Sequence, residues 1–221
     1  MRLSLSTATL LLLPSCALPF PAWEPLDDSL LARELSDSFP DQHPSSRLTI
    51  RAIMSLDGMD LPLTLRVLRL SPDKLRVIAM EDLGGTLFHF VGRGDAIEVI
   101  ASAAAIPPEV LSRGVAEEMA LWLLFASQDG DTAVRIDSDR AGLLREHGDR
   151  HILFWSSTGS AFDHIADGRN GRLRREFDLE WDGDRPATAR ITNHEFSYTM
   201  DLEVLQWQPA DLAPDDFRTD R

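Results

Sequence analysis

Apolar and polar residues alternate along five short segments in the first half of the chain. Alternation with a period of two places successive side chains on opposite faces of a β-strand. Turn signals such as Asp57-Gly58 and Gly84-Gly85 separate the segments, as they do in hairpins. The pattern therefore predicts an antiparallel meander with strands at residues 47–56, 61–70, 74–80, 86–91 and 95–100.

Strand-like alternation returns in the second half of the chain and is clearest in residues 172–182. There, Leu173, Arg175, Phe177, Leu179 and Trp181 share one face, which is mostly apolar, and charged residues occupy the other. Such a strand buries one face and exposes the other to water. We predict further strands at residues 132–137, 143–146, 151–155 and 187–192, and a last strand with Tyr198, Met200, Leu202 and Val204 on one face.

Two segments follow helical rather than strand spacing. Residues 24–38 are predicted to form an amphipathic helix with acidic residues in its first turn and a leucine stripe, Leu26, Leu30, Leu31 and Leu35, that packs on the core. A second helix is predicted at residues 109–126, after Pro107-Pro108. Nearly every residue from 119 to 125 is apolar, so this helix should be covered on most sides and fill a curved sheet.

These elements predict an α+β fold that is mostly antiparallel β. We expect a curved meander sheet, or half-barrel, closed by the N-terminal helix and the central helix, within one domain over residues 26–221. The apolar content of 43% is sufficient for a sizeable core.

The start of the chain has the pattern of an export signal. Residues 1–15 combine one basic residue with a short apolar stretch and end directly before Cys16, the only cysteine. We predict a signal peptide at residues 1–15, acylation of Cys16, and a proline-rich lipidated tether at residues 16–25. This predicts a lipid-anchored protein of the outer membrane that faces the periplasm, with an ordinary secretory signal and an incidental cysteine as the alternative.

The net charge of −14 excludes nucleic acid as a favourable partner, because phosphate binding depends on clustered Lys and Arg. It also provides no electrostatic attraction to anionic lipid surfaces. Membrane association is therefore expected to depend on the acyl chains of Cys16.

The sequence contains no recognisable catalytic motif. His147 and His151 flank a turn without a third metal ligand at a familiar spacing, and Gly-x-Ser-x-Gly does not occur. We therefore expect no enzyme activity, no metal site and no cofactor.

The remaining candidate site is apolar. A curved sheet wrapped around the second helix would bring one set of side chains together on a concave surface, as candidates for a hydrophobic ligand site: Phe88, Phe90, Met119, Trp122, Phe154, Trp155 and Trp181. A filled core is the default alternative for such residues. Periodicity alone does not choose between cavity and core.

Taken together, the lipobox-like start, the two helices and the long meander resemble the half-barrel of the bacterial lipoprotein carriers and receptors of the LolA/LolB type. More narrowly, residues 65–77, Gly84-Gly85-Thr86-Leu87-Phe88, Ile106-Pro107-Pro108-Glu109-Val110-Leu111 and Leu121-Trp122-Leu123 are similar to a family of uncharacterised bacterial lipoproteins. Members of that family are often encoded with aryl-polyene and polyketide-type pigment biosynthesis genes. The resemblance implies a hydrophobic cavity that accepts acyl chains, and it transfers no individual binding residue.

We therefore expect a non-enzymatic outer-membrane lipoprotein that holds or hands on an acyl, lipid or polyene-like ligand between the sheet and the central helix. The alternative is a scaffold lipoprotein with a filled core, whose acidic outer strands, around residues 174–182, dock a periplasmic protein partner.

Overall fold

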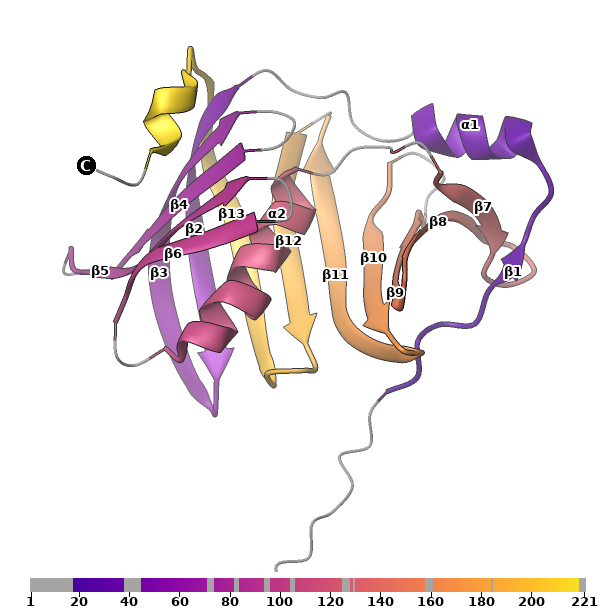
Figure 1. Ribbon diagram of the computed structural model, residues 1–221, viewed down its shortest axis with the longest axis horizontal. Coiled ribbons are helices and arrows are strands. Elements are labelled where there is room, and N and C mark those ends of the chain that lie inside the picture. Colours follow the sequence, from indigo (N-terminus) through magenta and orange to yellow (C-terminus); the bar gives the residue numbers. More distant parts are fainter. Residues whose placement is uncertain are drawn as a thin grey trace, which may run out of the picture.

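The computed structural model describes residues 18–37, 45–70, 74–81, 84–93, 96–103, 106–124, 128, 130–157, 161–183 and 185–218. Thirteen antiparallel strands form one sheet in the order β1-β7-β8-β9-β10-β11-β12-β13-β2-β3-β4-β5-β6. Among the described residues, β1 and β6 form the two edges, so the sheet is curved but open (Figure 1). The expected half-barrel of mostly antiparallel strands is confirmed.

The first meander contains β2 (Ser46–Leu56), β3 (Met59–Leu70), β4 (Lys74–Met80), β5 (Thr86–Arg93) and β6 (Ala96–Ser102). The second contains β7 (Thr132–Arg135), β8 (Ala141–His147), β9 (Arg150–Trp155), β10 (His164–Arg169), β11 (Arg172–Asp182), β12 (Arg185–Asn193) and β13 (Tyr198–Pro209). The pairing of β13 with β2 joins the two meanders. The short strand β1 (Glu24–Pro25) adds to the free edge of β7.

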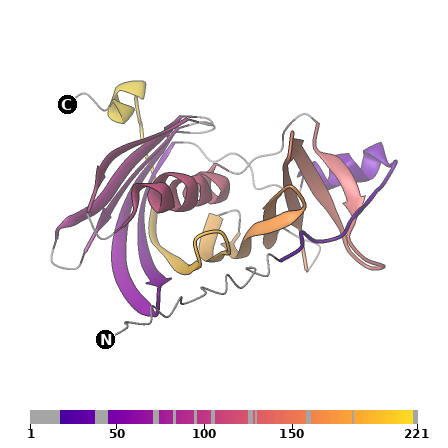
Figure 2. The same ribbon diagram turned by 60° about the horizontal axis from the view of Figure 1, so that its bottom comes forward.

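A central helix lies within the curve of the sheet (Figure 2). It consists of a π-helical segment, η1 (Val110–Val115), that continues into α2 (Ala116–Leu123). Buried residues of this helix and of the sheet face around it form one large apolar core. We call this side of the sheet the helix-covered face and the other side the outer face.

The central helix was predicted at residues 109–126, and its segment Val110–Val115 is π-helical rather than α-helical. At Gly114 a Cβ atom would lie 2.7 Å from the hydroxyl oxygen of Tyr198. Glycine therefore lets the helix approach β13 more closely than any other residue would. Single π-helical turns inside helices occur frequently at functional sites.

The N-terminal helix is shorter than predicted. Helix α1 covers Ser29–Asp37, because the Asp28 carboxylate accepts hydrogen bonds from the backbone N–H groups of Leu30 and Leu31 and so caps the helix there. The prediction of helix from residue 24 is wrong, since Glu24–Pro25 pairs with β7.

The leucine stripe of α1 is only partly a core face. Leu35 packs against the main core, whereas Leu30 is 73% exposed. The helix lies beside β7 and β8, where it covers one end of the sheet rather than the middle (Figure 1). The prediction that the whole stripe packs on the core is therefore wrong for Leu30.

The described part of the expected tether packs on the outer face of the sheet. Phe20 and Trp23 contact a second apolar cluster formed by β7–β11, and the N–H of Phe20 donates to the Gly171 carbonyl at 3.0 Å. A Cβ atom at Gly168 would lie 2.3 Å from a ring carbon of Phe20. From Leu18 onward the segment is thus packed against the domain. The signal peptide and Cys16 lie outside the described residues.

The C-terminal segment covers another part of the outer face. Phe217, in the 3₁₀ helix η2 (Pro214–Phe217), packs with Val91 and Leu212 over β3–β5. Between these two covered areas, the outer face of β11–β13 and β2 carries mainly polar side chains. In the described part of the chain, no helix is both long enough and apolar enough to cross a membrane.

Candidate functional site

Five of the seven predicted cavity residues meet between the helix-covered face and the central helix. Phe88 and Phe90 come from β5, Met119 and Trp122 from α2, and Phe154 from β9, and each is at most 2% exposed. Phe88 and Phe90 are stacked with ring centroids 6.1 Å apart, and Phe154 lies 6.2 Å from Phe162. The arrangement is a continuous apolar layer closed to solvent.

The two other candidates lie elsewhere or at the margin. Trp181 is partly buried against the apolar layer, and its indole N–H donates to the Phe162 carbonyl at 2.8 Å. Trp155 belongs to the cluster on the outer face and stacks on His164 at 5.2 Å. Neighbours along a strand point to opposite faces, so Trp155 does not join Phe154 in the layer.

One polar atom inside the layer has no partner. The indole N–H of Trp122 is buried and forms no hydrogen bond with any described residue. An unpaired buried donor costs about 1–3 kcal/mol, and native structures contain few of them. The layer therefore combines an apolar lining with an unused hydrogen-bond donor.

A buried polar network anchors the first half of the central helix to the sheet. Arg175 of β11 is fully buried and forms ion pairs with Asp167 of β10 at 2.7 Å and with Glu117 of the helix at 2.8 Å. It also donates a hydrogen bond to the Arg113 carbonyl. Arg150 forms a second ion pair with Asp167 at 2.7 Å. Burial by itself lowers the pKa of Arg175, but the nearby carboxylates together outweigh burial and raise the pKa, so the guanidinium stays charged.

Glu118 extends this network toward β12 and β13. Its carboxylate accepts hydrogen bonds from Tyr198 and from the Asn193 side-chain amide, both at 2.6 Å, and lies 3.6 Å from Arg175. Burial raises the pKa of Glu118, and burial also raises the pKa of the Tyr198 hydroxyl. The network therefore fixes the start of α2 through directed contacts.

Sequence reasoning missed this network, although a signal was present. Arg175 stands in the middle of an otherwise apolar strand face. A register shift between Asp167 and Gly168 marks a β-bulge there. Arg174 and Arg175 are both buried beside it, Arg174 with Glu195 of the β12–β13 turn and Arg175 with the Arg113 carbonyl. Strand β10 was also missed, because four of its six residues are buried and the alternation disappears.

A groove of about 620 Å³ lies on the polar part of the outer face. Cross-strand neighbours line it in sequence, with His164 beside Asp178, Asp178 beside Arg190, and Arg190 beside Asp201. Its other charged residues are Arg51, Asp163, Glu180 and Glu203. Five carboxylates against two guanidinium groups make the groove acidic.

The described residues contain no group of three or more His, Cys, Asp and Glu side chains able to hold a metal ion. Of the two histidines considered above, His151 lies 3.2 Å from Glu146 and packs near Phe20, and His147 is exposed at the end of β8.

Comparison with known proteins bears on the fold. No protein-family model matches the chain. No curated protein matches its sequence. A LolA superfamily protein from Nitrosomonas europaea has a similar structure, with a TM-score of 0.62 at 14% identity, over 85% of this chain and 97% of that one. A putative outer membrane lipoprotein-sorting protein domain from Vibrio parahaemolyticus gives a TM-score of 0.53 at 13% identity, over 85% and 95% of the two chains. The LolA-like part of the resemblance is thereby confirmed at the level of the fold.

Proposed function

We propose that the protein is a non-enzymatic, lipid-anchored envelope protein that holds or hands on a hydrophobic ligand between the sheet and the central helix. The ligand class is an acyl, lipid or polyene-like chain, and the anchor is an acylated Cys16 at the outer membrane. The observation that carries the proposal is the apolar layer of Phe88, Phe90, Met119, Trp122 and Phe154, closed beneath one helix. The LolA-like fold supports a carrier-like function.

An acyl chain can replace side-chain contacts in the apolar layer because these contacts are non-directional. The polar network holds the helix near Arg113, Glu117 and Glu118, whereas the later residues Met119, Trp122 and Leu123 pack through apolar side chains. An acyl chain that enters replaces apolar contacts with similar ones, so the exchange costs little hydrophobic free energy. The C-terminal part of α2, from Met119 to Leu123, then moves away from the sheet, and the helix stays anchored through Arg113, Glu117 and Glu118.

The test uses the full chain with Cys16→Ser, which removes the expected acylation site. Native mass spectrometry and extraction of the purified protein should reveal a retained lipid or polyene, and a fatty-acyl probe should bind to the emptied protein. An empty monomer that binds no such probe would refute the proposal.

Anchoring is tested separately by fractionation. The wild-type chain should sediment with outer membranes and incorporate radiolabelled palmitate, whereas the Cys16→Ser chain should do neither. Palmitate-free wild-type protein would refute the anchor and leave the ligand proposal standing.

A second candidate function is favoured by the acidic groove on the outer face. A scaffold that docks a basic segment of a periplasmic protein would use the row of Asp178, Glu180 and Glu203. Complementary charges steer such an encounter and fix its register. Asp178→Asn with Glu180→Gln should then release a stoichiometric partner, whereas Glu98→Gln on the edge strand β6 should not.

A further inference from the structure

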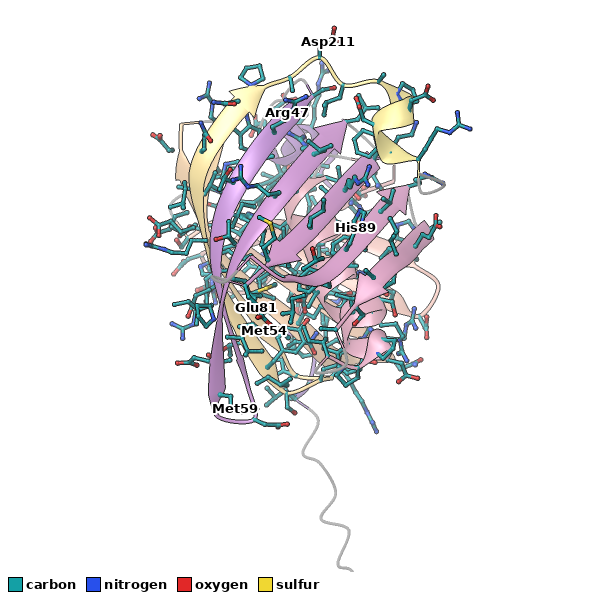
Figure 3. The ribbon with its side chains drawn as sticks, turned by 90° about the vertical axis from the view of Figure 1, so that its left-hand side faces the viewer. Arg47, Met54, Met59, Glu81, His89 and Asp211 are labelled. Atoms are coloured by element: carbon teal, nitrogen blue, oxygen red, sulfur yellow. The ribbon has the colours of Figure 1, made fainter. Side chains whose placement is uncertain are left out.

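A buried arginine lies at one end of the helix-covered face. Arg69 of β3 and Ser46 of β2 are direct cross-strand partners. The alternation of β2 and β3 places them on the same face as Leu48 and Val67, which belong to the apolar core. This end of β2 is the one that carries Arg47 and lies toward Asp211 in Figure 3. The two polar side chains therefore continue the apolar layer beyond its last hydrophobic pair.

Both side chains are enclosed without a hydrogen-bond partner. Arg69 is 4% exposed and Ser46 is fully buried. Neither Nε of Arg69 nor Oγ of Ser46 forms a hydrogen bond, and no carboxylate of the described residues forms an ion pair with Arg69. The one aromatic contact is with Trp207 of β13, whose ring lies 5.8 Å below the guanidinium carbon. Trp207 itself packs against the main core.

The other buried arginines of the described chain are all paired. Arg145 binds Asp131 at 2.8 Å, Arg174 binds Glu195, and Arg175 binds Asp167 at 2.7 Å. Arg69 lacks such a carboxylate, and burial lowers its pKa to about 10. A charged group that is buried without a counter-ion is rare and calls for an anion from elsewhere.

We propose that Arg69, Ser46 and Trp207 form the headgroup site for the anionic end of an amphiphilic ligand, a carboxylate or a phosphate. The inference rests on the proposed function, whose ligand class it narrows to amphiphiles with an anionic head. The guanidinium donates two parallel hydrogen bonds to the anion, as its planar fork does with carboxylates and phosphates. The Ser46 hydroxyl donates a third, and the apolar chain runs from this end past Leu48 and Val67.

Three ligands with the same apolar chain test the site: oleate, oleyl phosphate and oleyl alcohol. Each is titrated into the Cys16→Ser chain by isothermal calorimetry. A hydrogen bond to a charged group corresponds to a preference of about 10- to 100-fold, so at least one anionic ligand should bind about 10-fold more tightly than the alcohol. The ratio of oleate to oleyl phosphate distinguishes a carboxylate from a phosphate head.

Arg69→Met should abolish this preference and leave alcohol binding unchanged. Ser46→Ala should reduce the preference by about tenfold, the loss expected for one hydrogen bond to a charged group. The matched control is Arg66→Met on the outer side of the same strand, where Arg66 contacts Thr49 and is exposed; it should behave as the parent chain. Arg69→Met is expected to fold, because it removes an unpaired buried charge.

The outcomes separate the two proposals. Equal binding of all three ligands, or an anion preference that survives in Arg69→Met, would overturn the headgroup site and leave the ligand-binding function intact. Binding of none of the three would overturn the proposed function itself.

Discussion

Arg69 and Arg175 are both buried arginines on strands of the same sheet, and their surroundings are opposite. Arg175 meets Asp167 and Glu117 at hydrogen-bonding distance, and these acids raise its pKa. Arg69 meets a tryptophan ring and an unused hydroxyl, and burial lowers its pKa to about 10. Arg175 is therefore a buried cation with carboxylate partners in the fold, and Arg69 is a buried cation without one among the described residues.

The difference assigns the two arginines to different tasks. Arg175 connects β10, β11 and the central helix, so its charge is used within the folded chain. Arg69 contributes an unpaired charge at the end of the apolar layer, where it lowers stability unless an anion binds. Proteins retain such locally unfavourable groups mainly at functional sites.

The largest effect is expected for Arg175→Met. The substitution leaves the buried Glu118 without its cation and leaves the buried Asp167 with Arg150 alone. Breaking a buried pair in this way costs about 3–5 kcal/mol. Urea unfolding followed by circular dichroism measures the loss in the free energy of unfolding.

The matched control for Arg175 is Arg190→Met on the adjacent strand. Arg190 forms an exposed ion pair with Asp201 at 3.5 Å, and such pairs contribute about 0–1 kcal/mol. If both variants lost the same small amount of stability, the network would not be the anchor described above.

Arg69→Met should have the opposite sign and raise the free energy of unfolding by about 1–3 kcal/mol at neutral pH. A base whose pKa is lower in the folded state binds its proton more weakly there than in the unfolded chain. The loss of stability that results from burying the charged guanidinium is complete below about pH 10 and is relieved as the pH rises above that value.

Chemical denaturation at neutral pH, in buffer without phosphate or sulfate, measures the gain for Arg69→Met. Arg66→Met serves as the control, because Arg66 is exposed on the opposite face of β3. A clear loss of stability in Arg69→Met would mean that the guanidinium already has a partner in the fold.

The smallest effect is a pH dependence at Glu118. Burial raises its pKa in the folded state, so the cost of keeping it ionised is complete above that pKa and is relieved as the pH falls through it. Glu118→Gln cannot titrate. The free energy of unfolding of the wild type relative to this variant should therefore increase as the pH falls through the raised pKa toward the ordinary pKa of a glutamate.

The control for this titration is Glu203→Gln, an exposed acid paired with Arg51 on the outer face. This control retains Glu118 and should therefore keep the pH dependence that Glu118→Gln removes. A Glu118→Gln profile parallel to that of the wild type would show that Glu118 titrates in the folded protein as it does in the unfolded chain.

Much of the fold was predictable because one periodic signal governs it. The strands at residues 74–80 and 172–182 were predicted with the bounds observed for β4 and β11, since β4 alternates throughout and β11 alternates from Arg175 onward. The face predicted for Leu173 is wrong, because the bulge opposite Asp167 and Gly168 places Leu173 in the outer-face cluster. A strand whose two faces are both buried does not alternate between apolar and polar residues. Strand β10 was therefore not predicted. The prediction placed the start of helix α1 too early in the sequence. The short pairing of Glu24 and Pro25 with β7 depends on residues that are distant in sequence, so the local pattern did not reveal it.

The candidate site was predictable in composition but not in its polar contacts. Six of the seven apolar candidates lie in or against one layer, as expected from their strand faces and helix positions. Two features depend on the register between strands and on the position of the helix on the sheet. They are the pairing of Arg175 with helix carboxylates and the absence, in the described part of the chain, of a carboxylate partner for Arg69 beside Ser46. A single sequence does not encode these contacts as a recognisable pattern.

Photo-crosslinking shows whether an apolar chain binds between the sheet and the central helix. A fatty acid with a diazirine near the end of its chain is irradiated with the Cys16→Ser protein, and the labelled peptides are mapped. We predict labelling of β5 and α2, around Phe88, Phe90 and Met119, that excess oleate suppresses. Labelling confined to the outer-face groove, or labelling that oleate does not suppress, would show that the chain does not bind between the sheet and the central helix.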